Sequence, residues 1–293
     1  MLCDCVSLYE IFQYEHGRDY QHGQGQSGSW GAGQEPSGAK LAAMLGAIGI
    51  FGKQSSNEGK DITGVAALLK EADAMYEAGN KKEVKKLLEG KFTENPEVLW
   101  RLARSYYDTA EEMPAASKLD RKRICEKAME VITQALEKSD GSFAVHKWYG
   151  IILNKSAEYQ GTSATIQSSF IVKEHWEKAA ALNPKDPTSC SLLGEWHFSV
   201  AGITGLKRSL AATLFATPPT ATYAQALEYF LRAEAIQAGF WLKNQLNIAK
   251  CYIEEKDMGN AKMWLSKLVN EGKVVTSEDR ATVAEAKRLL GKI

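Results

Sequence analysis

A helical apolar period is the feature that most constrains how this chain can fold. From about residue 61 onward, apolar residues recur at three- and four-residue spacing, which places them on one stripe of an amphipathic helix. Turn residues interrupt the pattern at Gly79-Asn80, Asn95-Pro96, Asp140-Gly141, Asn183-Pro184, Pro218-Pro219, Gly239 and Gly272. No alternating strand pattern lies between these breaks. The chain is therefore predicted to be all-α, with ten or eleven helices in antiparallel pairs.

The predicted pairs share an internal repeat. Their first helices carry Trp100-Ala103-Arg104-Tyr107, Cys190-Leu193-Gly194-His197 and Gln245-Ile248-Ala249-Tyr252. Their second helices carry ladders of small and large residues: Ala128-Ile132-Ala135, Val172-Trp176-Ala179, Ala226-Phe230-Ala233 and Ala261-Leu265-Leu268. This pattern resembles the tetratricopeptide repeat, in which small residues let paired helices approach closely. One pair cannot bury its own stripe, so residues 61–293 are predicted to stack into a solenoid.

One interval breaks the repeat spacing. His197 and Ala226 are 29 residues apart, whereas the repeat expects about nine between these positions. The extra residues, Gly205–Tyr223, are predicted to form either a loop excursion or a short helix (Leu206–Phe215) that closes over one face of the solenoid.

Residues 1–60 differ in composition from the rest of the chain. They hold eleven of the 24 glycines, and Gly17–Gly38 is rich in Gly, Gln and Ser, which predicts a flexible, disordered tail. The first fifteen residues combine Val6, Leu8, Tyr9, Ile11 and Phe12 with the acids Asp4, Glu10 and Glu15, which predicts a short helix that is too acidic for a mitochondrial transit peptide. The apolar segment 39–51 is shorter than the ~20 residues of a membrane span. A docked helix, an interfacial membrane anchor and a disordered segment remain alternatives for it.

Charge and cysteine usage exclude several classes of protein. The 36 Lys and Arg residues balance the 36 Asp and Glu residues, so a dedicated nucleic-acid binder is not expected. The five cysteines are scattered without metal-ligand spacing, which indicates reduced thiols and no bound metal or cofactor. Two local basic patches, at 81–86 and 118–127, serve either for solubility or for contact with an acidic surface such as tubulin or anionic lipid.

Five segments carry a more specific resemblance: WRLAR (Trp100–Arg104), HKWYGIILN (His146–Asn154), IVKEHWEKAAALNPKDPTS (Ile171–Ser189), LLGEWHFSVA (Leu192–Ala201) and LFATPPTATYAQALEYFLRAEAIQAGF (Leu214–Phe240). Together they resemble the regulator of microtubule dynamics family over about residues 62–291. The resemblance implies a non-enzymatic tetratricopeptide-like protein of the cytoplasm, cytoskeleton and spindle poles. Such a protein associates with microtubules and acts in microtubule dynamics and in spindle function or chromosome segregation. One branch of the family implies the alternative of a mitochondrion-associated module that binds phospholipid and tethers mitochondria to the endoplasmic reticulum.

The repeat phase predicts which residues face the concave groove, where a peptide helix, an extended tail or an acyl chain would bind. The candidate partner-binding residues, from the groove and from the basic positions near it, are Arg101, Arg104, His146, Lys147, Tyr149, Lys173, Trp196, Lys207, Arg208 and Lys250. His197 and Cys125, Cys190 and Cys251 are predicted to be packing residues. No Ser/His/Asp or HExxH arrangement is present, so no catalytic residue is predicted.

Overall fold

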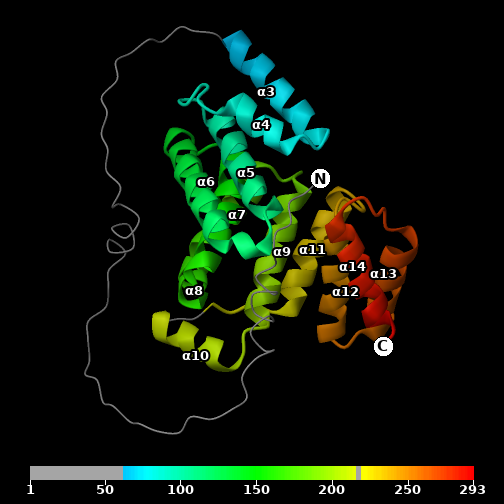
Figure 1. Ribbon diagram of the computed structural model, residues 1–293. Helices are drawn as coiled ribbons and strands as arrows, with labels where there is room; N and C mark the ends of the chain where they lie inside the picture. The colour runs from blue at the N-terminus through cyan, green and yellow to red at the C-terminus, as the bar shows by residue number, and fades with distance from the viewer. Residues whose placement is uncertain (1–61, 216–218) are drawn as a thin grey trace, which may run out of the picture.

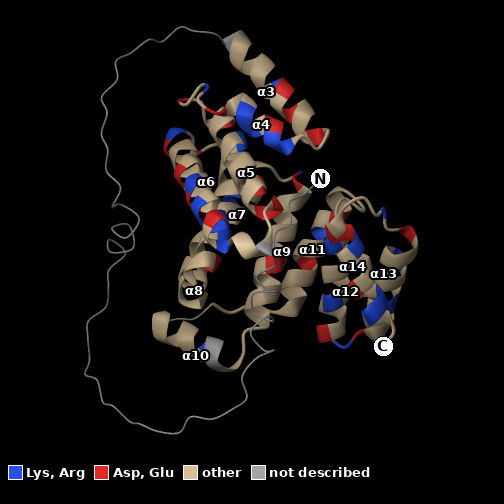
Figure 2. Ribbon diagram, viewed as in Figure 1, with Lys and Arg blue, Asp and Glu red and all other residues tan. Residues whose placement is uncertain are grey.

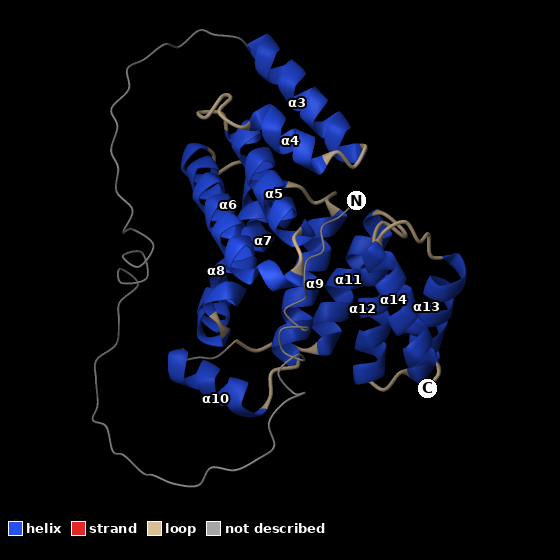
Figure 3. Ribbon diagram, in the orientation of Figure 1, coloured by secondary structure: helices blue, strands red, loops and turns tan. Residues whose placement is uncertain are grey.

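The computed structural model describes residues 62–215 and 219–293, in which all regular structure is helical (Figures 1 and 3). Twelve α-helices lie in this part of the chain, together with the short 3₁₀ turn Ala115–Ser117. They are α3 (Ile62–Glu77), α4 (Lys81–Leu88), α5 (Pro96–Glu112), α6 (Lys118–Lys138), α7 (Phe143–Gln160), α8 (Thr162–Leu182), α9 (Pro187–Ala201), α10 (Gly205–Leu214), α11 (Tyr223–Ile236), α12 (Leu242–Glu254), α13 (Met258–Glu271) and α14 (Ser277–Leu290). The predicted tail and the apolar segment 39–51 lie outside the described residues.

The helices stack as antiparallel pairs, which confirms the predicted all-α solenoid. α3 packs with α4, α5 with α6, α7 with α8, α9 with α11, and α12 with α13, while α14 covers the last pair (Figure 1). The count of twelve exceeds the expected ten or eleven because the excursion after α9 contains a helix of its own, α10.

Helix starts follow from local chemistry at the predicted breaks. Asn95 caps α5 by accepting a hydrogen bond from the Glu97 N–H at 2.9 Å, and Pro96 occupies the first helical turn. Asp186 caps α9 in the same way. Three of the observed breaks were not predicted: those between α5 and α6, between α7 and α8, and between α12 and α13. At the second of these, α7 ends at Gly161, whose φ of 102° lies in the region that favours glycine.

The ladder residues of the second helices form the core. All twelve are at most 3% exposed, which confirms that the repeat pattern predicts packing. Close approach between paired helices depends on two glycines at the same repeat position. A Cβ atom on Gly194 would lie 2.6 Å from the Phe230 ring, and one on Gly150 would overlap Trp176. The three described cysteines are buried and unpaired, and His197 is 7% exposed, as predicted for packing residues.

The excursion does not close over the concave face. α10 lies against α8, where the rings of Phe215 and Phe170 meet edge to face with centroids 4.8 Å apart. α8 is the second helix of its pair, so α10 covers the outer side of the stack. Among the described helices, none has the length and apolar character needed to cross a membrane.

Candidate functional site

A cavity of about 350 Å³ opens on the concave face, within the size range of small-molecule and side-chain binding pockets. It is built from α3, α5, α7, α9 and the residue that precedes α12. Its lining residues are Asp73, Tyr76, Glu97, Trp100, Arg101, Arg104, Phe143, Ala144, Lys147, Trp148, Ile151, Thr188, Leu192 and Trp241. We call this cavity the concave pocket. Five aromatic rings and several charged groups therefore meet in one place.

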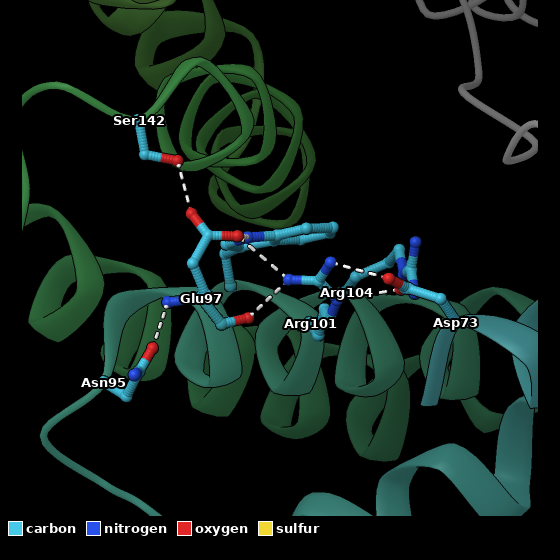
Figure 4. Close-up of polar contacts among 7 residues, drawn as sticks. Asp73, Asn95, Glu97, Arg101, Arg104 and Ser142 are labelled. Carbon is cyan, nitrogen blue, oxygen red and sulfur yellow. Dashed lines mark hydrogen bonds and ion pairs between the residues drawn. The ribbon is translucent and has the colours of Figure 1, made fainter. Parts of the chain in front are cut away.

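Arg101 clamps α3 to α5 at one wall of the concave pocket (Figure 4). Its Nε and Nη2 donate to the two Asp73 oxygens at 2.8 and 2.7 Å, which is a bidentate pair. Its Nη1 donates to the Glu97 carbonyl and carboxylate, both at 2.9 Å. Burial alone would lower the pKa of Arg101, but these hydrogen bonds outweigh it and raise that pKa. Arg101 is thus occupied by protein carboxylates and positions the wall.

Glu97 joins the same wall to the start of α7. Besides Arg101, its Oε2 accepts from Trp100 Nε1 at 2.7 Å, and its Oε1 accepts from Ser142 Oγ at 2.9 Å. Because Ser142 is the residue before α7, Glu97 fixes the spacing of α5 and α7 across the pocket. Both pocket carboxylates, Asp73 and Glu97, therefore have structural roles.

Arg104 forms the floor of the concave pocket. Its guanidinium carbon lies 3.4 Å from the ring centroid of Tyr76 and 5.1 and 6.0 Å from those of Trp100 and Trp148. Stacking of this kind stabilises a buried cation. Its ion pair with Asp73 measures 3.9 Å, longer than a hydrogen bond, and the residue is 8% exposed. The floor is therefore cationic and aromatic at once.

Lys147 brings a further cation to the opposite wall. Its Nζ lies 3.0 Å from the Asp186 carboxylate, the same group that caps α9. The lining as a whole holds three cations and two carboxylates, with an apolar side formed by Ile151 and Leu192. Because Asp186 pairs with Lys147 from outside the lining, the three cations at the pocket are matched by three carboxylates. The aromatic and apolar surface is therefore what the pocket offers, and it suits an apolar side chain.

A second cavity of about 230 Å³ adjoins the first through Trp241, which lines both. Phe240, Leu242, Lys273, Val275 and Glu278 are among its lining residues. The indole Nε1 of Trp241 donates to Glu278 Oε2 at 3.0 Å, so this ring is held in place between the two cavities. The two cavities therefore form one elongated surface that continues past Trp241.

The structure brings three of the predicted partner-binding residues together. Arg101, Arg104 and Lys147 all line the concave pocket. Tyr149 does not, because the phase of α7 is shifted by one residue: Trp148 faces the pocket, and Tyr149 stacks on His175 with centroids 4.3 Å apart. Burial raises the pKa of Tyr149.

His146 was expected near the groove but does not line the concave pocket. It is 2% exposed and lies between α7 and α8. Its Nε2 faces the Asp140 carbonyl at 3.0 Å and the Asp140 carboxylate at 3.3 Å, so Nε2 carries the ring proton. Its Nδ1 then accepts from His175 Nδ1 at 2.8 Å. Burial, followed by the charges of His146 and Lys178, lowers the pKa of His175 to about 4. This histidine pair is therefore a feature of the helix interface, away from the pocket.

The other predicted residues lie elsewhere. Trp196 is 2% exposed and donates from Nε1 to the Ser169 carbonyl at 2.9 Å, so it is a core residue and does not line the groove. Lys173 pairs with Glu177 and lies over the Trp196 ring at 5.4 Å. Lys250 pairs with Glu285 at 3.0 Å. Arg208 is exposed on α10, remote from the pocket lining, and the side chain of Lys207 lies outside the described residues.

Sequence reasoning missed several lining residues. Asp73 and Tyr76 lie three apart on α3, so the helical period places them on one side, but nothing local indicates that Arg101 and Arg104 would meet them. Trp241 also lines the pocket, from the position directly before α12.

The described residues contain no group of three or more His, Cys, Asp or Glu side chains placed to hold a metal ion. The basic patch at 81–86 forms α4, where Lys82 and Lys86 are exposed and Glu83 is the single acid (Figure 2). In α6 the cations of the second patch are offset by neighbouring acids, as in the pairs of Arg123 with Asp120 and Lys127 with Glu130. α4 is therefore the more strongly basic surface of the two.

Known proteins resemble this chain over the same helical region. The family model described as Regulator of microtubule dynamics protein 1-3 matches residues 68–293. Regulator of microtubule dynamics protein 1 of Pongo abelii is 40% identical over 227 residues, which cover 77% of this chain and 72% of that protein. Regulator of microtubule dynamics protein 3 of Rattus norvegicus is 37% identical over 236 residues, which cover 78% of this chain and 50% of that protein.

A solved structure supports the fold alone. The thermophilic TPR protein TTC0263 of Thermus thermophilus superposes with a TM-score of 0.51 at 14% identity, covering 76% of this chain and 98% of that protein. This similarity agrees with the stacked helix pairs.

Proposed function

Since the chain belongs to the regulator of microtubule dynamics protein 1-3 family, we propose that it is a microtubule-associated interaction protein with no chemistry of its own. The family match over residues 68–293 carries this proposal. The concave pocket supports it, because the two pocket carboxylates are held by Arg101 and the aromatic rings form a binding surface. The finer role is in spindle function or chromosome segregation, at the cytoskeleton and spindle poles.

The contact with microtubules is assigned to the exposed basic face of α4. Lys82 and Lys86 project from a short helix whose charged residues are four lysines and one glutamate. An acidic polymer surface attracts such a patch, and the attraction is screened over about 8–10 Å near physiological salt. The concave pocket then remains available for a segment of a partner protein.

Co-sedimentation with stabilised microtubules tests this assignment. We expect the chain to pellet at low salt, to be released as salt rises, and to lose most of its binding when Lys82→Glu and Lys86→Glu are combined. The control combines Lys185→Glu with Lys287→Glu, which makes the same charge change at exposed positions on other faces. Absence of pelleting at low salt would refute the proposed function, and equal loss in both variants would refute the role of α4.

A phospholipid-binding or organelle-tethering role is the second candidate. An excursion closing over the groove would favour it, but α10 instead packs on α8. The remaining support is the apolar segment 39–51, which lies outside the described residues. Flotation with anionic liposomes and native mass spectrometry test it: co-purified lipid would favour this role over a protein partner.

A further inference from the structure

One exposed phenylalanine lies in a backbone conformation that its residue type disfavours. Phe92, in the loop that joins α4 to α5, has a φ of 47°, which is in the left-handed region. Two residues earlier, the chain enters the same region with Gly90, whose φ is 75°. Glycine takes this conformation without steric cost, whereas a bulky residue is an outlier there. Strain that a glycine would relieve at an exposed position points to a use for the side chain.

The Phe92 ring is not part of the core. Phe92 is 39% exposed, whereas Leu88, the last residue of α4, is fully buried among core residues. The backbone N–H of Asn95 donates to the Phe92 carbonyl at 2.9 Å, so a backbone hydrogen bond holds this turn without the ring. The loop projects from the edge of the stack at the end of α4 (Figure 1). The ring is therefore accessible to a partner.

Three lysines near the ring are exposed and make no ion pair with any described residue. They are Lys82, Lys86 and Lys91. Lys82 and Lys86 lie four residues apart, which places them on one side of α4. Lys86 belongs to the last turn of that helix, where the loop begins, and Lys91 directly precedes Phe92. We call Phe92 and these three lysines the α4 docking surface.

The two carboxylates that flank the ring along the chain are held against the protein. Glu89 Oε1 accepts a hydrogen bond from the Tyr106 hydroxyl at 2.6 Å. Burial, followed by this hydrogen bond, raises the pKa of Tyr106 to about 12, so the hydroxyl keeps its proton and remains a donor. On the other side of the ring, Glu94 pairs with Lys138 of α6. Neither carboxylate is directed at the three exposed lysines.

The surface stays cationic when its pairs are counted. Residues 81–92 hold five lysines and two glutamates, and Lys81 pairs with Asp108 at 3.5 Å. Four lysines against two glutamates remain, with an exposed aromatic ring at one end. An aromatic anchor beside charged contacts is typical of protein interfaces, and charge complementarity selects an acidic partner.

We propose that the α4 docking surface binds an acidic protein surface that offers an apolar recess for the Phe92 ring, while the lysines contact the carboxylates around that recess. This inference rests on the proposed function, since it takes the microtubule as the acidic partner of α4. It adds an apolar anchor to a contact that charge alone would leave unspecific. The strained loop holds the ring outward before the partner arrives.

Co-sedimentation with stabilised microtubules over a range of salt concentrations separates the two contributions. Contacts between exposed charges are screened as salt rises, whereas burial of an apolar ring is not. Phe92→Asn removes the ring and supplies a residue that tolerates the left-handed region. We expect it to weaken binding about fivefold, by the same factor at every salt concentration, since 39% of the residue is left to bury. Lys91→Gln removes one charge beside the ring and should instead reduce the slope of binding against salt.

Urea unfolding of the same variants separates binding from stability. Phe92→Asn should raise the urea midpoint or leave it unchanged, because it relieves the backbone strain. Phe92→Trp keeps an aromatic ring and should keep the binding of the wild type. A lower midpoint for Phe92→Asn would show that the ring is held for stability, and loss of binding in Phe92→Trp would show that an aromatic anchor is not what the partner receives. Either result would overturn the proposal.

Two control variants lie in the last helices of the stack. Lys256 is a second residue other than glycine with a positive φ, 63°, so Lys256→Asn relieves similar strain and should leave pelleting unchanged. Val275 is 61% exposed, so Val275→Asn removes an apolar side chain from another surface and should also leave pelleting unchanged. A loss in Val275→Asn equal to that in Phe92→Asn would indicate general apolar adsorption and overturn the proposal.

The outcomes also separate this proposal from the proposed function. If the wild-type chain pellets and Phe92→Asn pellets equally well, the anchor is overturned and the proposed function stands. A loss that shrinks as salt rises would overturn the anchor too, since the ring would then act through the lysines. If the wild type fails to pellet at low salt, both are overturned. Flotation with phosphatidylserine–phosphatidylcholine vesicles is the last comparison: a loss for Phe92→Asn that equals or exceeds the loss on microtubules would identify a membrane contact and overturn the acidic protein partner.

Discussion

Replacement of Gly194 by Ala tests whether close helix approach holds the stack together. The new Cβ would lie 2.6 Å from Cδ1 and Cε1 of Phe230, whereas carbon atoms pack at about 3.5–4.0 Å. The ring would have to move by about 1 Å. Phe230 is fully buried against Ala226, Ile248 and Cys251, so it has no free space to enter. Overpacking of this kind costs about 1–3 kcal/mol.

The higher helix propensity of Ala offsets up to about 1 kcal/mol of that cost, so a matched control is needed. Gly259→Ala makes the same change in α13 at an exposed position, where the Cβ would meet only Asp257 Oδ1 at 3.6 Å. The difference between the two variants isolates the clash. We expect Gly194→Ala to be less stable than Gly259→Ala by about 1–3 kcal/mol.

Urea unfolding, monitored by circular dichroism and by tryptophan fluorescence, measures this difference in the free energy of unfolding. If the two probes report the same transition, both variants are fitted with one m value. A double-mutant cycle with Phe230→Leu should shrink the cost of Gly194→Ala, because the smaller side chain leaves room. Equal stability of the two alanine variants within about 0.5 kcal/mol would refute the packing argument.

Other perturbations follow from the polar groups. Arg101→Ala removes both hydrogen bonds that Arg101 donates to the Asp73 carboxylate. We expect the free energy of unfolding in urea to fall by about 1.5–3 kcal/mol and amide exchange in α3 to become faster; unchanged exchange in α3 would contradict the clamp. The folded pKa of His175 is about 4, so stability present above pH ~6.5 should be lost as pH falls from ~6.5 to 4; His175→Asn should flatten that loss, and an NMR titration near 6.5 would refute it. Burial raises the pKa of Glu158 to about 7, so its contribution is full below pH ~4.5 and is lost as pH rises through 7; Glu158→Gln should remove that loss, and an unchanged pH profile would count against it.

Much of the fold could be predicted because the repeat is a local pattern. Ala226, Phe230 and Ala233 follow one another on a single helix, so their spacing alone indicates a buried stripe, and the structure buries all three. The course of α10 could not be predicted in this way. Its side of the stack depends on the contact between Phe215 and Phe170, which are 45 residues apart.

The pocket was predictable only in part, since its residues meet across helices. The phase of α5 placed Arg101 in the groove, but the same rule applied to α7 selected Tyr149 where Trp148 lines the pocket. Neighbouring residues of an α-helix differ by about 100° around its axis. Where the repeats are irregular, their spacing does not fix the rotation of a helix to within that angle. The pairing of Arg101 with Asp73 joins residues 28 positions apart, and nothing in either local sequence specifies it.

One wall of the concave pocket is formed by α3, the first described helix of the stack. α3 packs on α4 and α5, and terminal units of a solenoid open more readily than internal ones. Because Asp73 and Tyr76 belong to α3, undocking of that helix would dismantle the clamp and uncover the stacked face of Arg104. Pocket occupancy and docking of the end helix are therefore linked equilibria, and any ligand that needs the intact wall stabilises the end of the solenoid by mass action. Amide exchange in α3 would then report whether the pocket is occupied.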